Sequence, residues 1–173
     1  MVCNGELRPG RILDIGCGTG DNAIYLAKNG LSVVGLDPEL NAVETARARA
    51  ARESTEVDFV VGNGGHLTEL FRDGEFDAVI DTGFFRTLSE PERHKNIQQV
   101  HRVLRNGGRY YLICFSEREY NESARKRLSP EDLRRALGAD FRLNYVRDTV
   151  LDSGLNTGGA MAYLVSSTKT FTG

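Results

Sequence analysis

Short apolar runs alternate with amphipathic stretches along most of the chain. The runs are rich in Val, Ile, Leu or Phe without strict polar–apolar alternation, and they cover residues 11–16, 32–37, 57–62, 76–83 and 109–117. Such runs are typical of parallel strands that are covered on both faces. The stretches between them predict helices near residues 21–29, 38–53, 66–72 and 89–105. Strands that alternate with helices in this way indicate an α/β fold with a parallel sheet.

The ends of the predicted helices carry recognisable signals. Pro38 is placed in the first turn of its helix. Gly30 and Gly107 stand just past two helices, where a left-handed residue is commonly needed. We therefore expect the fourth helix to end before Gly107 and the fifth strand to follow it.

The last third of the chain predicts one helix and a hairpin. The segment SPEDLRRALG begins at Ser129 and has Asp132 at the third helical position, which is a good start signal. Two apolar segments follow at 141–151 and 161–169, joined by a short, turn-rich link that favours antiparallel pairing. Five parallel strands followed by a terminal hairpin are therefore expected.

Composition narrows the functional classes. The chain has 173 residues, 40% hydrophobic and 27% charged, which fits one globular domain. Its net charge of −2 gives no overall field for nucleic acid. The longest apolar run, 110–115, is far shorter than the ~20 residues of a membrane span, and no signal pattern opens the chain, so a cytoplasmic protein without membrane contact is expected. Three widely spaced cysteines match neither a disulfide framework nor a zinc site, and no metal is expected.

The segment RILDIGCGTGD, residues 11–21, is the most informative motif. Its glycines fall at alternate positions, and Asp21 occupies the place of the last glycine in a dinucleotide fingerprint. Asp14 and Asp21 flank the start of the next helix and would repel a pyrophosphate there. A phosphate-binding P-loop is excluded because no Gly-Lys-Ser/Thr follows. The loop therefore favours a ligand with positive charge.

A further acid indicates which ligand this is. Asp37 closes the second strand, about twenty residues after the loop begins, where a carboxylate accepts hydrogen bonds from ribose hydroxyls. An adenosine that carries a cationic, amine-bearing tail in place of phosphates is S-adenosylmethionine.

ILDIGCGTG, followed by VVGLDPE, resembles the class I S-adenosylmethionine-dependent methyltransferases. The likeness continues through VVGNGGHL (60–67), FDAVIDTGFF (76–85) and VLRNGGRYYLICFSE (103–117). DTGFFRTLSEPER is most similar to the small-molecule type related to thiopurine and quinone methyltransferases. The resemblance implies a doubly wound, mostly parallel seven-stranded sheet of order 3-2-1-4-5-7-6, with strand 7 antiparallel and helices on both faces. It also implies a single domain over 1–173 that lacks most of the usual N-terminal cap.

The resemblance implies a set of cofactor-binding residues for S-adenosylmethionine and its product S-adenosylhomocysteine. These are Asp14, Gly16, Cys17, Gly18, Asp37, Pro38, Asn63, Gly64 and Asp81. Gly16 and Gly18 would lie against the methionine part of the cofactor, and Asp14 beside its ammonium group. Asp37 would bind the ribose, and Asn63 and Gly64 the adenine edge. Asp81 would close the pocket beside the sulfonium. Cys17 is expected to pack within the loop and not to act as a nucleophile.

Three departures from the family pattern bear on activity. Asn63 stands where Asp is common and still offers a carbonyl to the adenine amino group. Arg86 stands where His is frequent in the subgroup, and an arginine cannot accept a proton at neutral pH. The chain begins only ten residues before the first strand, so we expect an open site, a truncated chain, or a cap supplied by a second copy or a partner chain. No catalytic residue is identified.

Substrate recognition is expected from two loops, 82–90 and 116–129, at the carboxyl edge of the sheet. Phe84 and Phe85 would form apolar walls, while Arg86 and Tyr120 would contact an anionic or aromatic small molecule. The simpler alternative for Tyr120 is an exposed loop tyrosine.

The same loops carry further arginines, with a simpler alternative of their own. Arg118 and Arg125 would pair at the surface with the acids of their loop, Glu117, Glu119 and Glu122.

Other functional classes are weaker. The fourth strand is not followed by Asn/Asp-Pro-Pro-Tyr, which together with the acidic balance makes a nucleic-acid substrate unlikely. A cofactor-binding but inactive regulatory or structural subunit is the main alternative. A nicotinamide oxidoreductase ranks below both.

Overall fold

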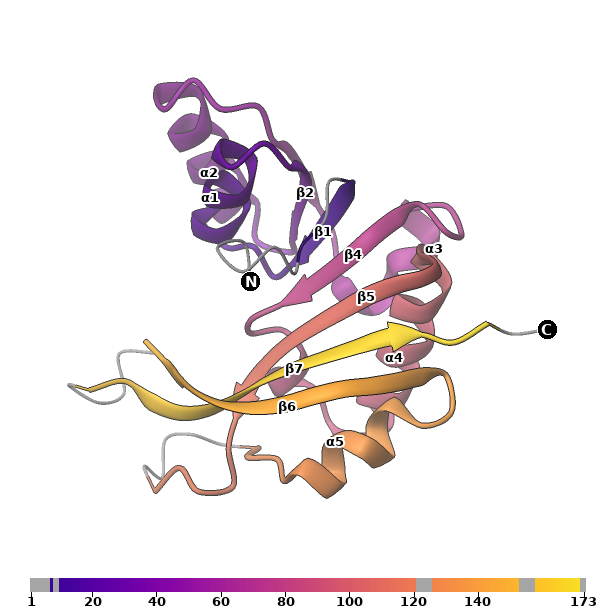
Figure 1. Ribbon diagram of the computed structural model, residues 1–173. Helices are drawn as coiled ribbons and strands as arrows, with labels where there is room; N and C mark the ends of the chain where they lie inside the picture. Colours follow the sequence, from indigo (N-terminus) through magenta and orange to yellow (C-terminus); the bar gives the residue numbers. More distant parts are fainter. Residues whose placement is uncertain (1–6, 8–9, 121–125, 153–157, 172–173) are drawn as a thin grey trace.

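One sheet of seven strands organises the chain (Figure 1). The computed structural model describes residues 7, 10–120, 126–152 and 158–171. The strands are β1 (Arg11–Ile15), β2 (Ser32–Asp37), β3 (Asp58–Val61), β4 (Phe76–Asp81), β5 (Leu104–Phe115), β6 (Phe141–Leu151) and β7 (Ala160–Lys169). Their order is β3-β2-β1-β4-β5-β7-β6, and β7 runs antiparallel to both neighbours while the other pairs are parallel. The predicted fold class and strand order are confirmed.

Helices cover both faces of this sheet. They are α1 (Asp21–Lys28), α2 (Leu40–Arg52), α3 (Leu67–Leu70), α4 (Glu90–Val103) and α5 (Pro130–Leu137), with 3-10 turns η2 (Gly64–His66) and η3 (Phe85–Thr87). α1 and α2 lie on one side, and α3, α4 and α5 on the other (Figure 1). The start of α5 is as predicted, because the Ser129 hydroxyl accepts the Asp132 amide hydrogen and the Asp132 carboxylate accepts from the Ser129 amide.

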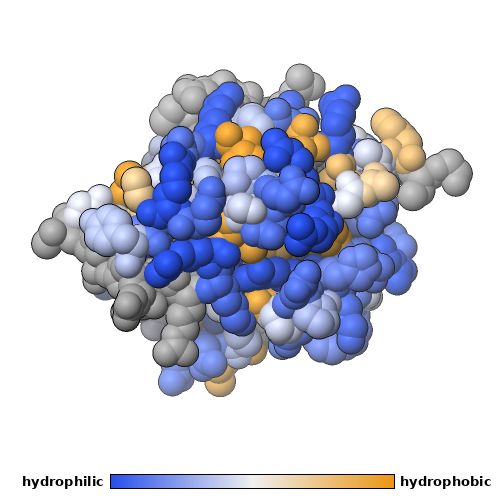
Figure 2. All heavy atoms as spheres, turned by 90° about the horizontal axis from the view of Figure 1, so that it is seen from below, coloured by the Kyte–Doolittle hydropathy of each residue, from blue (hydrophilic) through white to orange (hydrophobic). Residues whose placement is uncertain are grey.

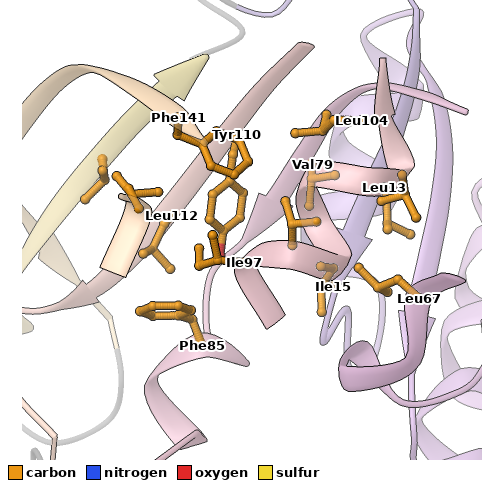
Figure 3. Packing of buried hydrophobic residues seen from close by; sticks show 14 of the residues in the cluster. Leu13, Ile15, Leu67, Val79, Phe85, Ile97, Leu104, Tyr110, Leu112 and Phe141 are labelled. Atoms are coloured by element: carbon orange, nitrogen blue, oxygen red, sulfur yellow. The ribbon is translucent and has the colours of Figure 1, made fainter. Parts of the chain in front are cut away.

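Two apolar clusters fill the two sides of the sheet. Neighbouring residues of one strand point to opposite faces, so Ile12 packs with α1 and α2 while Leu13 packs with α4 and α5. The second and larger cluster is drawn in Figure 3, where Phe85, Ile97 and Leu112 lie together at one end. This arrangement fixes the loops at the carboxyl edge, because they leave strands that are buried on both faces.

The junction of α4 with β5 differs from the prediction. β5 begins at Leu104, directly after the helix, and Gly107 lies inside the strand. Gly107 keeps the expected left-handed φ of 71°, but it belongs to an irregularity in which Phe76 pairs with Leu104 and Ala78 with Arg109. A glycine signal for positive φ is shared by helix ends and strand bulges, and here the bulge explains it.

Other boundaries differ by a few residues. The second helix begins at Leu40, past Pro38, and the predicted helix 66–72 is a 3-10 turn followed by four helical residues. β4 ends at Asp81, two residues earlier than predicted, because that carboxylate binds the amides that follow it.

The surface seen from below Figure 1 is mostly hydrophilic, with apolar side chains in separate small patches (Figure 2). Within the described part of the chain, no helix has the length and apolar character needed to cross a membrane.

Candidate functional site

The glycine loop turns tightly from β1 into α1. The amides of Gly16 and Cys17 both donate to the carbonyl oxygen of Leu36 on β2, at 2.8 and 3.0 Å. Gly16, Gly18 and Gly20 all have positive φ, at 70°, 53° and 87°, a conformation that L side chains rarely adopt. A Cβ on Gly18 would meet no described atom within 4 Å. At Gly18 the loop therefore presents bare backbone to open space, as close approach of a ligand requires.

Asp37 joins the glycine loop to the end of β2. Its Oδ2 accepts from the Gly18 amide at 2.9 Å, and its Oδ1 accepts from the Glu39 amide at 2.9 Å. Each carboxylate oxygen can accept more than one hydrogen bond, so the carboxylate is held in place while acceptor capacity remains. Pro38 between them is exposed.

The carboxylate of Asp14 is buried without an ion-pair partner among the described residues. It is 0% exposed, and neither of its oxygens has a hydrogen-bond partner among the described residues. Burial, followed by repulsion from Asp81 and Asp37, raises the pKa of Asp14 to about 8. A cation bound beside this carboxyl group would favour its ionised form, so the site is suited to a positively charged ligand.

Asp81 is equally buried but is used by its own loop. Its carboxylate oxygens accept from the amides of Gly83, Phe84 and Phe85 at 2.8–3.2 Å. Burial raises the pKa of Asp81 to about 6, and these backbone amides partly offset the rise. The carboxylate thus builds the turn that carries the predicted substrate residues. Its role towards the cofactor stays a prediction.

Three carboxylates therefore meet at the carboxyl ends of β1, β2 and β4. None of them, Asp14, Asp37 or Asp81, is in an ion pair among the residues that the structure describes. These ends lie around the junction of β1 and β4, where the strand order reverses and where open α/β sheets bind ligands. This donor set fits a nucleoside with a cationic amino-acid tail and opposes a diphosphate.

The charge of Asp21 is neutralised, which refines the sequence argument. Arg49 of α2 binds the Asp21 carboxylate at 2.6 Å and donates to the Thr19 carbonyl and hydroxyl. Arg47, on the same helix, donates to the Phe59 carbonyl at 2.6 Å. These arginines therefore hold the glycine loop and β3 through their hydrogen bonds.

The segment after β3 is held by Asn96 of α4, a residue that the sequence reasoning missed. Asn63 caps η2, its Oδ1 accepting from the Gly65 amide at 2.8 Å, so this oxygen is already engaged. The Gly64 carbonyl accepts from Asn96 Nδ2 at 2.9 Å. Asn96 is 1% exposed and lies one helical turn before buried Val100. Its place on the apolar stripe of α4 was the available signal.

Cys17 packs inside the loop, 8% exposed. Burial and the neighbouring carboxylates Asp14 and Asp37 raise the pKa of its thiol to about 12. A thiol in that state is a poor nucleophile at neutral pH.

The predicted substrate residues occupy different environments. Phe84 is half-buried and packs beside the cofactor loop, its Cβ 3.3 Å from where a Cβ on Gly16 would stand. Phe85 is 1% exposed and belongs to the core, so it supports the turn from beneath and does not line an open wall. Tyr120 is 78% exposed.

The arginines of the two loops separate in the same way. Arg86 stacks on Phe115, with its guanidinium carbon 4.7 Å from the ring centroid. Arg118 pairs with Asp148 of β6, thirty residues away, and its ion pairs among the described residues do not include Glu117 or Glu119. Arg125 lies outside the described residues. Of Arg86 and Arg118, Arg86 is the one that stands beside the turn built by Asp81.

Comparisons with known proteins agree with this geometry. Residues 12–108 match the family described as methyltransferase domain. The chain is 33% identical over 170 residues to the demethylmenaquinone methyltransferase of Thermus thermophilus, covering 96% of this chain and 69% of the relative. It is 34% identical over 109 residues to the 2-heptyl-1-hydroxyquinolin-4(1H)-one methyltransferase of Mycobacteroides abscessus, covering 62% of this chain and 47% of the relative. The fold matches an S-adenosylmethionine-dependent methyltransferase of Methanosarcina mazei with a TM-score of 0.85 at 23% identity, over 99% of this chain and 97% of that one.

Proposed function

Because this chain belongs to the S-adenosylmethionine-dependent methyltransferases, we propose that it methylates a small, ring-bearing acceptor by in-line displacement at an O, N or S atom. The carboxylates of Asp14 and Asp37 beside the bare glycine loop are the observation that carries this proposal. The two curated relatives support the acceptor class, since their names denote a quinone and a hydroxyquinolinone. The chain spans about two thirds of the first relative and about half of the second.

The cofactor, when bound, supplies an electrophilic methyl group on a positively charged sulfur. In the proposed transfer, the acceptor atom would bond to the methyl carbon as the carbon–sulfur bond breaks, and the electron pair of that bond would stay on the sulfur. The acceptor thereby loses one unit of negative charge or gains one of positive charge. A thiolate, a phenolate or a ring nitrogen reacts in this way without a dedicated base.

The chain's own residues bind and orient in this scheme. Asp37 would accept hydrogen bonds from the ribose, and Asp14 would face the ammonium group. Gly64, held by Asn96, would place its backbone at the adenine edge. Phe84, packed beside Gly16, would exclude water next to the reacting groups. Alignment of this kind supplies several kcal/mol of the barrier, so no catalytic side chain is required.

Asp37→Ala is expected to weaken S-adenosylhomocysteine binding ten- to hundredfold. Loss of hydrogen bonds to a charged acceptor costs about 1.5–3 kcal/mol, and the Gly18 amide also loses its partner. Calorimetric titration measures the change. Asp73→Ala, at an exposed surface ion pair with Arg102, serves as the control and should leave the affinity unchanged. An unaltered affinity in Asp37→Ala would mean that the ribose binds elsewhere.

Turnover tests the proposed activity directly. Radiolabelled methyl transfer is assayed against thiols, phenols and nitrogen heterocycles, and transfer to at least one class is expected. A chain that binds S-adenosylhomocysteine tightly but transfers no methyl group to any of them would instead be a regulatory or structural subunit.

A further inference from the structure

Charge is divided across the carboxyl edge of the sheet. On the cofactor side stand the carboxylates of Asp14, Asp37 and Asp81, without ion pairs among the described residues. On the other side, the turn of η3 is surrounded by cations. Arg93 donates to the Phe85 carbonyl at 3.4 Å, and Lys126 donates to the Thr87 carbonyl. The side expected to receive the acceptor is therefore cationic.

Two arginines near the turn keep a buried donor nitrogen without a partner among the described residues, Nη2 of Arg93 and Nε of Arg86. Arg93 already binds the Phe85 carbonyl and lies over the Phe85 ring, whereas Arg86 binds no acceptor through its Nε. Its guanidinium lies over Phe115, the last residue of β5, and its Nε is 3.7 Å from where a Cβ on Gly83 would stand. This Nε is buried and has no hydrogen-bond partner in the part of the chain that the structure describes. The guanidinium also has no carboxylate partner there.

Packing alone does not account for this state. An aromatic ring attracts a guanidinium, but it supplies neither a counter-charge nor a strong acceptor for a buried N–H. Buried donors are nearly always satisfied in folded proteins. The nearby acids are engaged, since Asp81 binds three backbone amides and Glu92 caps Ser89. Arg86 is half-buried beside the predicted cofactor site, and its Nε has no acceptor among the described residues. This state points to an anion that is brought by a ligand.

Resting on the proposed function, we propose that Arg86 is a specificity-determining residue that binds an anionic oxygen of the acceptor. Guanidinium groups bind carboxylates and similar anions through paired N–H donors. The anionic oxygen belongs to a carboxylate or to an ionised ring hydroxyl. Arg86 thus selects acceptors that arrive as anions, and a ring hydroxyl that arrives already ionised needs no proton acceptor.

The test compares charged and neutral ring compounds on the chain saturated with S-adenosylhomocysteine. The probes are benzoate against benzamide, and 4-nitrophenolate against 4-nitroanisole, titrated at millimolar concentration. Wild type should bind at least one anion about tenfold or more tightly than its neutral partner. Benzoate binding alone identifies the carboxylate, and 4-nitrophenolate binding alone identifies the ionised hydroxyl.

Arg86→Gln should abolish this preference while leaving S-adenosylhomocysteine affinity unchanged. Arg102→Gln, which removes an exposed arginine paired with Asp73, should keep the preference. Thermal unfolding monitors folding, and Arg86→Met, which keeps the apolar stem over Phe115, replaces the glutamine variant if that one is unfolded.

Two results would overturn the assignment. One is a wild-type chain that binds neither anion better than its neutral partner. The other is an Arg86 variant that keeps the wild-type preference. Failure of S-adenosylhomocysteine to bind would count against the proposed function, whereas a chain that binds it and ignores the anion contradicts the role of Arg86 alone.

Discussion

Replacing Phe85 with alanine is expected to lower the free energy of unfolding by about 3–5 kcal/mol. The ring is 1% exposed and packs in the larger apolar cluster with Ile97 and Leu112 (Figure 3). It also lies under the guanidinium of Arg93, whose central carbon is 5.3 Å from the ring centroid. Truncation would leave a cavity and remove this cation–π contact. Urea unfolding measures the loss.

Phe171→Ala provides the matched control. Its ring is 76% exposed, so the same truncation should change stability by roughly 0.5 kcal/mol or less. A loss below about 1 kcal/mol in Phe85→Ala would show that the ring is not part of the core. It would then be available as the apolar wall that the sequence predicts.

Replacing Asp14 with asparagine is expected to stabilise the free chain at alkaline pH. The pKa of Asp14 is raised from 3.8 to about 8 by burial and neighbouring carboxylates. Between these values the folded chain holds a proton that the unfolded chain has released, so wild-type stability falls as pH rises. Asparagine removes this dependence. The stability of the variant relative to wild type should therefore increase by about 3–4 kcal/mol from pH 5 to pH 8.

Urea unfolding at both pH values measures this change. The difference in stability between the variant and wild type is compared at the two pH values. Costs that do not depend on pH, such as that of burying the new amide, then cancel. Asp21→Asn is the control, because that carboxylate is exposed and paired with Arg49, and no alkaline gain is expected. A stability difference that stays constant from pH 5 to pH 8 would contradict a proton held by Asp14.

The fold was largely predictable because its signals are local. Buried parallel strands give apolar runs, and helix starts such as Ser129 with Asp132 can be recognised within a few residues. The end of α4 was predicted wrongly because a glycine with positive φ occurs both past helix ends and in strand bulges, and Gly107 lies in a bulge. The end of β4 was misplaced because the bonds of the Asp81 carboxylate to three later amides are not visible in an apolar run.

The roles of the candidate site residues stay predictions, whereas the partners of several of them are seen in the structure and were not predictable from the sequence. The acids of the glycine region stand where the motif places them. The pairing of Asp21 with Arg49, 28 residues apart, and of Arg118 with Asp148, 30 residues apart, depends on the folded chain. These contacts decide which charges are neutralised. Sequence spacing shows that a charge is present, and only the fold shows whether it is free to bind.

The division of charge also gives the proposed reaction a physical logic. In the proposed reaction, carboxylates on one side would hold a cationic methyl donor, and Arg86 on the other side would receive an anionic acceptor. Methyl transfer would remove the sulfonium charge, whereas the ammonium group and the ribose, which the proposal places against Asp14 and Asp37, remain in S-adenosylhomocysteine.

Proton release on cofactor binding tests the central claim most directly. With a pKa of about 8, Asp14 holds its proton at pH 7 in the free chain. A bound cation would favour the carboxylate and expel that proton. Titration of S-adenosylmethionine at pH 7, in two buffers of different ionisation enthalpy, should therefore show release approaching one proton in wild type and near none in Asp14→Asn. Tight binding by wild type with no proton released would contradict a site in which a buried, unpaired carboxylate receives the cation.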